Sequence, residues 1–151
     1  MRPGARLGVD AGKARVGISV CDPSGLIATP VMTLNRASES LLDDFQRVVD
    51  EYSPIEVIVG LPLNLAGSHT PSTEDAIALA RELGQSTGLP VRMIDERLTT
   101  VSAHAAMRSV GKKQRGTRSV IDQVAAVMVL QHALDSERSS GSPAGTNIND
   151  L

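Results

Sequence analysis

The feature that most constrains the fold is a short, fully apolar segment near the middle of the chain, Val57-Ile58-Val59-Gly60. A run of this length and composition is typical of a strand that is buried on both faces of a parallel sheet. Apolar side chains recur at helical spacing in residues 41–49 before it and in residues 77–83 after it, so we expect a helix on either side of this strand in the sequence. A buried strand between two helices predicts an α/β fold.

The N-terminal part of the chain predicts an antiparallel meander. Residues 7–9 and 16–21 are apolar runs joined by a glycine-rich turn, and residues 26–34 form a third strand in which Pro30 favours an edge position or a bulge. The later elements are a last strand at residues 91–96 and helices at residues 101–110 and 120–135. The sequence therefore predicts a mixed five-stranded sheet, with a three-strand meander followed by parallel strands, and with helices on both faces.

The length of 151 residues fits one domain of ordinary size. We expect this domain to span residues 1–138 and to be followed by a disordered tail, residues 139–151, which is rich in Ser, Gly and Asn. The longest apolar run, residues 124–130, is too short to cross a bilayer, so a cytoplasmic protein without a membrane partner is expected. The single cysteine, Cys21, excludes an internal disulfide and makes a sulfur-held metal an unfavourable hypothesis.

The charge of the chain is close to balanced overall but is segregated along the sequence. A net charge of −2 argues against a protein that coats nucleic acid through bulk charge alone. Between residues 97 and 121, however, there is no acidic residue, and six basic residues occur: Arg97, Arg108, Lys112, Lys113, Arg115 and Arg118. This basic segment could contact phosphate groups, although a solvated loop would have the same composition.

Three carboxylates stand where a fold of this kind would place chemistry. Asp10 ends the first strand, Glu96 ends the last strand, and Asp122 opens the final helix. If these strands are parallel to the central one, their carboxyl ends converge at one edge of the sheet, and a helix packed there adds the third carboxylate. Oxygen ligands of this kind suit Mg²⁺ or Mn²⁺, and two such ions can activate water and stabilise the leaving oxygen of a phosphodiester. The pattern predicts a metal-dependent nuclease.

Each of these carboxylates also has a structural interpretation. Asp10 could hydrogen-bond the backbone of its own turn. Strand alternation places Asp95 and Glu96 on opposite faces, so either of them could be the inward group. Asp122 is the third residue of a helix that begins after Ser119, where a carboxylate stabilises the helix N-terminus without any catalytic role.

Four motifs together make the pattern specific. They are residues 8–17 (Gly-Val-Asp-Ala-Gly-Lys-Ala-Arg-Val-Gly), 59–64 (Val-Gly-Leu-Pro-Leu-Asn), 95–101 (Asp-Glu-Arg-Leu-Thr-Thr-Val) and 120–127 (Val-Ile-Asp-Gln-Val-Ala-Ala-Val), with Leu130-Gln131 after the last. In this order they resemble the YqgF/RuvX family of RNase H-like nucleases, and the resemblance spans residues 6–135. The sequence departs from the family pattern at Ala11, where a larger residue is common, and at Ser119, where a lysine is frequent.

The resemblance implies an RNase H-like fold, a metal-dependent endonuclease activity and a role in maturing the 5′ end of pre-16S rRNA. The same family is also described as Holliday junction resolvases, which would act on four-way DNA junctions. Matched onto this chain, the acidic residues of the family fall on Asp10, Glu96 and Asp122, and this match selects Glu96 over Asp95. The implied cofactor is Mg²⁺ or Mn²⁺, and the implied partners are pre-rRNA, with branched DNA as the other candidate, and a ribosomal particle.

Further candidates for substrate binding lie next to these carboxylates. Lys13 and Arg15 belong to the glycine-rich turn, and Asn64 and Thr99 lie on loops at strand ends, where each could contact substrate or only satisfy local backbone groups. Two other classes of protein remain open from the residues alone. One is an actin-like ATPase or sugar kinase, for which a chain of this length has no second lobe, and the other is a non-catalytic RNA-binding module. A monomer would suffice for RNA processing, whereas symmetric junction cleavage requires a homodimer.

Overall fold

The computed structural model describes residues 1–99 and 118–151 of the chain. The helix predicted at residues 101–110 lies outside these residues. The described elements are β1 (Arg6–Ala11), β2 (Arg15–Cys21), β3 (Ala28–Asn35), α1 (Leu41–Tyr52), β4 (Glu56–Leu61), α2 (Pro71–Thr87), β5 (Val91–Asp95), the 3₁₀ turn η1 (Glu96–Thr99), α4 (Arg118–Ser140), β6 (Thr146–Asn147) and the 3₁₀ turn η2 (Ile148–Asp150). Among these described elements, no helix is both long enough and apolar enough to span a bilayer.

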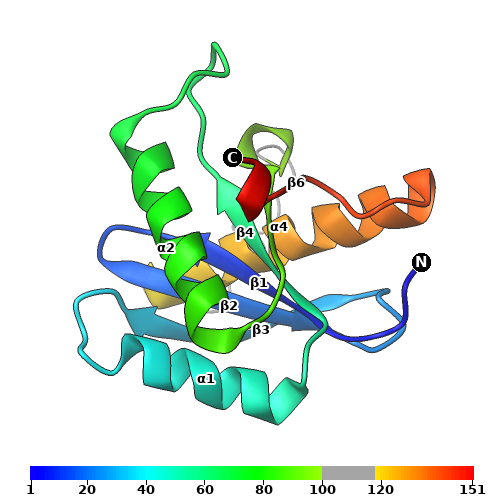
Figure 1. Cartoon of the computed structure of the whole chain (residues 1–151), viewed down its shortest axis with the longest axis horizontal. Helices are drawn as coiled ribbons and strands as arrows, with labels where there is room; N and C mark the ends of the chain where they lie inside the picture. The colour runs from blue at the N-terminus through cyan, green and yellow to red at the C-terminus, as the bar shows by residue number, and fades with distance from the viewer. Residues whose placement is uncertain (100–117) are drawn as a thin grey trace.

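The strands form one mixed sheet in the order β3-β2-β1-β4-β5-β6. β1, β4 and β5 are parallel neighbours, whereas β2 and β3 continue the sheet as an antiparallel meander. Helices α1 and α2 cover one face of the sheet, and α4 crosses the other (Figure 1). The predicted α/β class, with helices on both faces, is therefore confirmed, and the central parallel strand is the apolar segment from which the prediction started.

Local sequence signals account for the boundaries of several elements. Thr70 and Thr73 cap the start of α2 reciprocally, each side chain bonding the backbone N–H of the other, and Pro71 is the first helical residue. Gly88 ends this helix with a φ of 74°, a conformation that favours glycine. The prediction for Pro30 is also confirmed: β3 is an edge strand, and its register with β2 shifts beside this residue.

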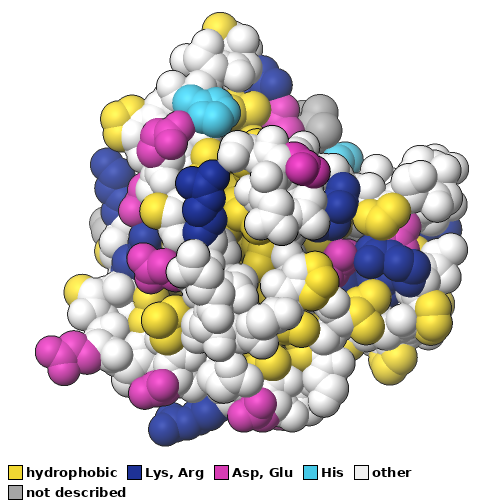
Figure 2. Space-filling model, viewed as in Figure 1, with side chains coloured by type: hydrophobic (Ala, Val, Ile, Leu, Met, Phe, Trp, Pro, Cys, Tyr) yellow, Lys and Arg dark blue, Asp and Glu magenta, His cyan; other side chains and the backbone are white. Residues whose placement is uncertain are grey.

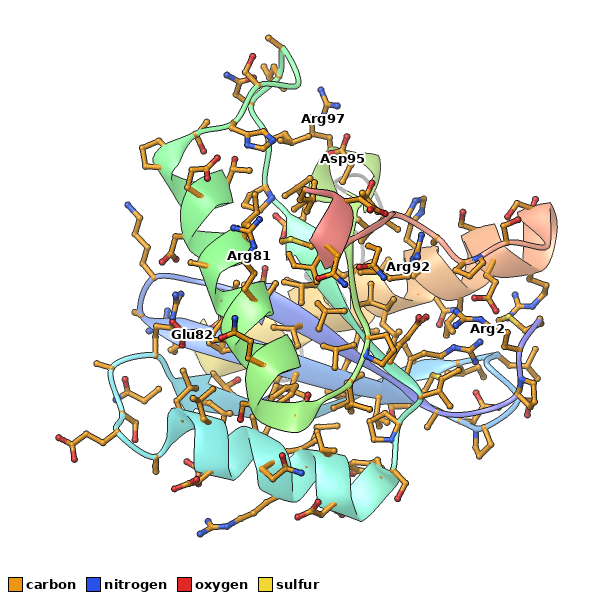
Figure 3. The ribbon with its side chains drawn as sticks, in the orientation of Figure 1. Arg2, Arg81, Glu82, Arg92, Asp95 and Arg97 are labelled. Atoms are coloured by element: carbon orange, nitrogen blue, oxygen red, sulfur yellow. The ribbon has the colours of Figure 1, made fainter. Side chains whose placement is uncertain are left out.

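The sheet has six strands where the sequence predicted five, because the C-terminal segment adds β6. Instead of a disordered tail, residues 141–151 return along β5, with Asn147 opposite Arg92 and Thr146 opposite Met93. The Arg92 guanidinium fixes this segment by donating to the carbonyl oxygens of Ala144 and Gly145, both at 2.7 Å (Figure 3). Because the pairing depends on these tertiary contacts, the composition of the segment did not reveal it.

Helix α4 packs unusually close to the sheet because glycines lie beneath it. A side chain at Gly17 would overlap the backbone carbonyl oxygen of Asp122, and a side chain at Gly8 would come within 2.8 Å of the Ala126 carbonyl oxygen. Beside Gly8, the Ser19 hydroxyl donates to the same Ala126 oxygen at 2.8 Å. These contacts hold the first turns of α4 directly over β1 and β2.

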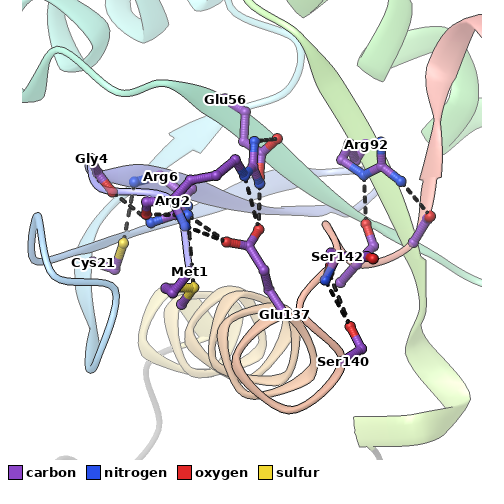
Figure 4. A network of polar contacts seen from close by, with 12 residues as sticks. Met1, Arg2, Gly4, Arg6, Cys21, Glu56, Arg92, Glu137, Ser140 and Ser142 are labelled. Carbon is purple, nitrogen blue, oxygen red and sulfur yellow. Dashed lines mark hydrogen bonds and ion pairs between the residues drawn. The ribbon is translucent and has the colours of Figure 1, made fainter.

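At the opposite end of the sheet, four charged residues form an ionic cluster: Arg2, Arg6, Glu56 and Glu137 (Figure 4). Arg6, Glu56 and Glu137 are each less than 5% exposed, and Arg6 bonds Glu137 at 2.9 Å. The cluster contains two positive and two negative groups, so each buried charge is compensated. It joins the N-terminal residue Arg2 and the first residues of β1 and β4 to the last turns of α4.

On the face that carries α1 and α2, Lys and Arg side chains alternate with Asp and Glu rather than gather into one patch (Figure 2). This distribution agrees with the balanced net charge of the chain and indicates that the face is not a broad phosphate-binding surface.

Candidate active site

Asp10 and Glu96 come together across the central strand of the sheet. Asp10 lies near the carboxyl end of β1 and Glu96 follows β5, while β4 separates the two strands. The side chain of Glu96 reaches over Gly60 of β4: a Cβ atom at this glycine would overlap the Glu96 carboxylate and lie 2.8 Å from its Cγ and Cδ. The two carboxyl groups are hydrogen-bonded to each other. We call Asp10 and Glu96 the carboxyl pair.

The environment of the carboxyl pair favours retention of one proton. Burial, which is the largest cause, together with the nearby Asp10 charge and the hydrogen bond to Asp10, raises the pKa of Glu96 to about 8. The pKa of Asp10 is also raised, chiefly by burial and in addition by the charge of Asp122, although the hydrogen bond with Glu96 opposes this change. Glu96 is thus the proton donor of the pair, and Asp10 accepts.

Asp122 lies close to the pair but binds another partner. The first turns of α4 pack on Gly17, which is the β2 residue directly opposite Asp10 in the sheet. Asp122 is near enough for its charge to raise the pKa of Asp10. Its carboxylate oxygen Oδ2 accepts a hydrogen bond from Nε of Arg15 at 2.7 Å. The third predicted carboxylate is therefore at the site, and its charge is compensated by an arginine.

The chemistry of these groups fits a hard divalent cation. The donors are carboxylate oxygens, and two of the carboxyl groups are partly buried and hydrogen-bonded to each other, an arrangement in which a cation would replace the proton between them. Gly60 leaves room above β4 for this meeting of side chains. In the structure as described at residues 1–99 and 118–151, no three His, Cys, Asp or Glu side chains gather closely enough to hold a metal ion. Asp10 and Glu96 could hold an ion, and Asp122 could join them after parting from Arg15.

Asp95 is turned away from the carboxyl pair. It forms an ion pair with Arg97 at 2.6 Å, and the hydrogen bonds from Arg97 hold the pKa of Asp95 below its ordinary value (Figure 3). Strand alternation left Asp95 and Glu96 as alternatives, and in the structure it is Glu96 that meets Asp10.

The other predicted residues differ in what they contact. Lys13 is exposed in the turn between β1 and β2, next to Arg15. The Asn64 side chain accepts from the backbone N–H groups of Ala66 and Ser68, so it stabilises its own loop. The backbone of Thr99 ends η1, and the backbone of Arg118 begins α4. Arg108, Lys112, Lys113 and Arg115 lie outside the described residues.

Sequence reasoning missed the residues that make room for this site or hold its turn. Gly60 and Gly17 were recognised only as parts of motifs, although both are glycines at the ends of apolar strands, which is a signal of close approach. Arg36 was not singled out. Its guanidinium donates to the Gly12 carbonyl oxygen at 3.0 Å and forms two bonds of 2.9 Å with Asp75 of α2, so it fixes the turn that carries Lys13 and Arg15.

A mixed sheet with this strand order, helices on both faces, and carboxylates at the ends of β1 and β5 defines an α/β protein of the RNase H-like class. The comparison with known families is consistent with this class. The sequence model of the RuvX family, described as "Holliday junction resolvase", matches residues 4–136. The chain belongs to the RuvX family, and it is thereby placed among the nucleases.

The similarity to known proteins extends over nearly the whole chain. A protein of Clavibacter michiganensis subsp. michiganensis is 52% identical over 150 residues, which are 98% of this chain and 93% of the relative. A protein of Streptomyces coelicolor is 47% identical over 150 residues, covering 98% of this chain and 90% of the relative. Both relatives carry the name "Putative pre-16S rRNA nuclease".

A solved structure confirms the fold independently of close sequence similarity. The chain resembles RuvC of T. thermophilus, determined in complex with a Holliday junction substrate, with a TM-score of 0.63 at 15% identity. The match covers 93% of this chain and 99% of the RuvC chain. At this identity the likeness concerns the fold alone.

Proposed function

We propose that this chain is a metal-dependent endonuclease that hydrolyses phosphodiester bonds in precursor rRNA, at the 5′ end of pre-16S rRNA, during ribosome biogenesis in the cytoplasm. The observation that carries the proposal is the carboxyl pair, because two partly buried acids that meet over a glycine form a costly arrangement which a cation would relieve. The names of the relatives support the choice of RNA as substrate.

In this proposal Asp10, Glu96 and Asp122 hold one or two Mg²⁺ or Mn²⁺ ions. When bound, such ions supply an activated water and stabilise the leaving oxygen of the phosphodiester. The chain itself contributes the placement of the three carboxylates. Asp10 is fixed by β1 and Glu96 by the end of β5, the two parallel strands on either side of β4, and Asp122 is fixed by the close contact of α4 with Gly17.

The residues that would bind the nucleic-acid backbone surround these carboxylates. Lys13 lies in the turn between β1 and β2, and Arg15, the first residue of β2, contacts Asp122 directly. Arg97 forms an ion pair with Asp95, and Asn64 bonds the backbone of the loop after β4. We therefore propose that these two residues stabilise loops that border the substrate. Thr99, Arg118 and the basic segment Arg108 to Arg115 complete the proposed backbone contacts.

The test is a cleavage assay in Mg²⁺ or Mn²⁺ on a precursor rRNA fragment and a four-way DNA junction, run side by side. Asp10→Asn should abolish cleavage without changing the fold. Asp95→Asn is the matched control, because it removes a neighbouring acid that faces away from the pair, and it should retain cleavage. If Asp10→Asn cleaves as well as the wild type, the assigned site is wrong.

The two substrates separate the proposal from its alternatives. Cleavage of the RNA alone, lost in Asp10→Asn, supports the proposed role. Paired cuts in the junction would replace it with a resolvase, which the description of the RuvX family favours and which requires a dimer. If neither substrate is cut while the RNA is bound, the chain is a non-catalytic rRNA-binding module.

A further inference from the structure

The ion pair between Arg15 and Asp122 connects two groups that the proposed function would use for different tasks. Arg15 opens β2 and Asp122 lies in the first turns of α4, 107 residues later, and their contact of 2.7 Å is made at Nε of the guanidinium. In the described part of the chain, Nε is the one nitrogen of this guanidinium with a hydrogen-bond partner. The paired terminal nitrogens therefore remain able to bind the two oxygens of a phosphate.

The ion pair between Arg15 and Asp122 is accessible to solvent. The Arg15 side chain is 33% exposed and that of Asp122 is 17% exposed, and Asp10 and Glu96 are also partly buried. A nucleic-acid backbone can thus reach the Arg15 guanidinium from solvent. An ion pair with this exposure is weak enough to be exchanged for other partners.

The backbone beneath Arg15 is held in place, so an exchange of partners requires only a side-chain movement. The turn before it is closed by a bond from the Gly12 N–H to the Arg15 carbonyl oxygen at 3.0 Å. The same turn is anchored to α2 through Arg36 and Asp75. Rotation of the long Arg15 side chain would move its guanidinium while β2 and α4 stay in position.

Electrostatics link the position of this guanidinium to the occupancy of the metal site. Without a metal, the Asp122 carboxylate lies near enough to the carboxyl pair for its charge to act on Asp10, and Arg15 supplies a compensating positive charge. A divalent cation held by Asp10, Glu96 and Asp122 would compete with Arg15 for the same carboxylate and would also repel it. The displaced guanidinium would then be next to the place where a phosphate must bind.

We infer that Arg15 exchanges partners: it occupies Asp122 in the metal-free protein and turns to a backbone phosphate of the nucleic acid when Asp122 binds the metal. The inference rests on the proposed function and adds that metal and nucleic acid bind with positive coupling, through this one side chain. Because coupling between two ligands is reciprocal, the metal tightens nucleic-acid binding and the nucleic acid tightens metal binding by the same factor.

The first experiment is a calorimetric titration of the metal-free protein with Mn²⁺. Arg15→Ala should bind Mn²⁺ about three-fold more tightly than the wild type, since an exposed ion pair no longer competes for Asp122. Asp122→Asn breaks the same ion pair from the other side and should bind Mn²⁺ more weakly. Lys13→Ala removes an equal charge from the same turn, and its affinity for Mn²⁺ should stay closer to that of the wild type.

The second experiment measures binding of a nuclease-resistant 2′-O-methyl RNA with and without Mn²⁺. The wild type should gain affinity on addition of Mn²⁺, and Arg15→Ala should gain several-fold less, even though its metal site is filled more easily. Tighter metal binding combined with weaker coupling to RNA is not expected from a residue that only stabilises the fold. Circular dichroism would confirm that the variants are folded, and Arg15→Lys, which keeps the charge, should restore part of the coupling.

The outcomes distinguish this inference from the proposed function. Unchanged or weaker Mn²⁺ binding by Arg15→Ala, or tightening matched by Lys13→Ala, would overturn the exchange of partners. Equal gains in RNA affinity in the wild type and Arg15→Ala would do the same. If Asp10→Asn leaves the affinity for Mn²⁺ unchanged, the proposed metal site itself is wrong, whatever the behaviour of Arg15.

Discussion

Replacement of Gly60 by alanine should slow cleavage while it leaves the stability of the fold nearly unchanged. The added methyl group would overlap the Glu96 carboxylate and lie 2.8 Å from two of its carbon atoms, whereas carbon atoms in contact are normally about 3.5 to 4 Å apart. Glu96 must therefore move by roughly 1 Å, and a misplacement of this size can lower a reaction rate by about 10²-fold. We expect Gly60→Ala to reduce cleavage of precursor RNA by about two orders of magnitude.

The effect on stability should be small, because the overlapping atoms belong to the end of a flexible side chain and not to the backbone. Alanine within a strand is favoured over glycine by about 0.5–1 kcal/mol, and an off-rotamer Glu96 would cost about as much. The free energy of unfolding, measured in urea, should thus stay within about 1 kcal/mol of the wild-type value.

The matched control is Gly84→Ala, which adds the same methyl group within α2, 3.2 Å from Val91 Cγ2 and away from the carboxyl pair. It should cleave RNA at the wild-type rate. Wild-type cleavage by Gly60→Ala would refute the idea that Glu96 needs the space over β4. A loss of about 3 kcal/mol or more in stability would show instead that the sheet itself cannot accept the substitution.

Three further predictions concern stability. Without divalent ions, the Tm should fall as the pH rises from 4.5, the ordinary pKa of Glu96, to about 8, its pKa in the folded protein. The reason is that the folded protein binds the Glu96 proton more tightly than the unfolded chain does, so loss of this proton destabilises the fold. The Tm of Asp10→Asn should depend less on pH. Glu137→Ala leaves the buried Arg6 without its carboxylate and should cost about 3–5 kcal/mol in urea unfolding. Arg47→Ala breaks an exposed ion pair with Asp44 and should cost about 1 kcal/mol or less; equal costs would contradict the role of burial. Gly145→Ala combines a φ of 72° with overlap of the Met93 carbonyl oxygen, so hydrogen exchange at Thr146 and Asn147 should accelerate, and unchanged protection would argue against the pairing of β6.

The parts of the fold that could be predicted are those written in local patterns. The apolar run at residues 57–60 identified the central strand, because a strand that is buried on both faces is apolar throughout. Helical spacing of apolar residues identified α1 and α2, because each of these helices buries one face on the sheet. β6 could not be predicted, since two polar residues have no period and their pairing depends on Arg92.

The candidate site was predictable to a similar extent. The approach of Asp10 and Glu96 follows from the convergence of parallel strand ends, so the sequence placed them together correctly, while their role as metal ligands stays a prediction. The bond between Arg15 and Asp122 was not foreseen. It depends on the height of α4 above β2, which is set by the contact with Gly17 and has no signature in the sequence of the helix.

Helix α4 connects the ionic cluster at one end of the sheet to Asp122 at the site. Asp122 and Glu137 are 15 residues apart on one helix, which corresponds to about 22 Å. Glu137 is locked into the ionic cluster at the first residues of β1 and β4, and Asp122 faces the last residues of β1. The helix is thus held at the ionic cluster and, through the contacts with Gly8 and Gly17, at the site. A shift of its C-terminal end would be transmitted along the helix to Asp122. Substitutions that never touch the substrate could in this way change how well it is cut.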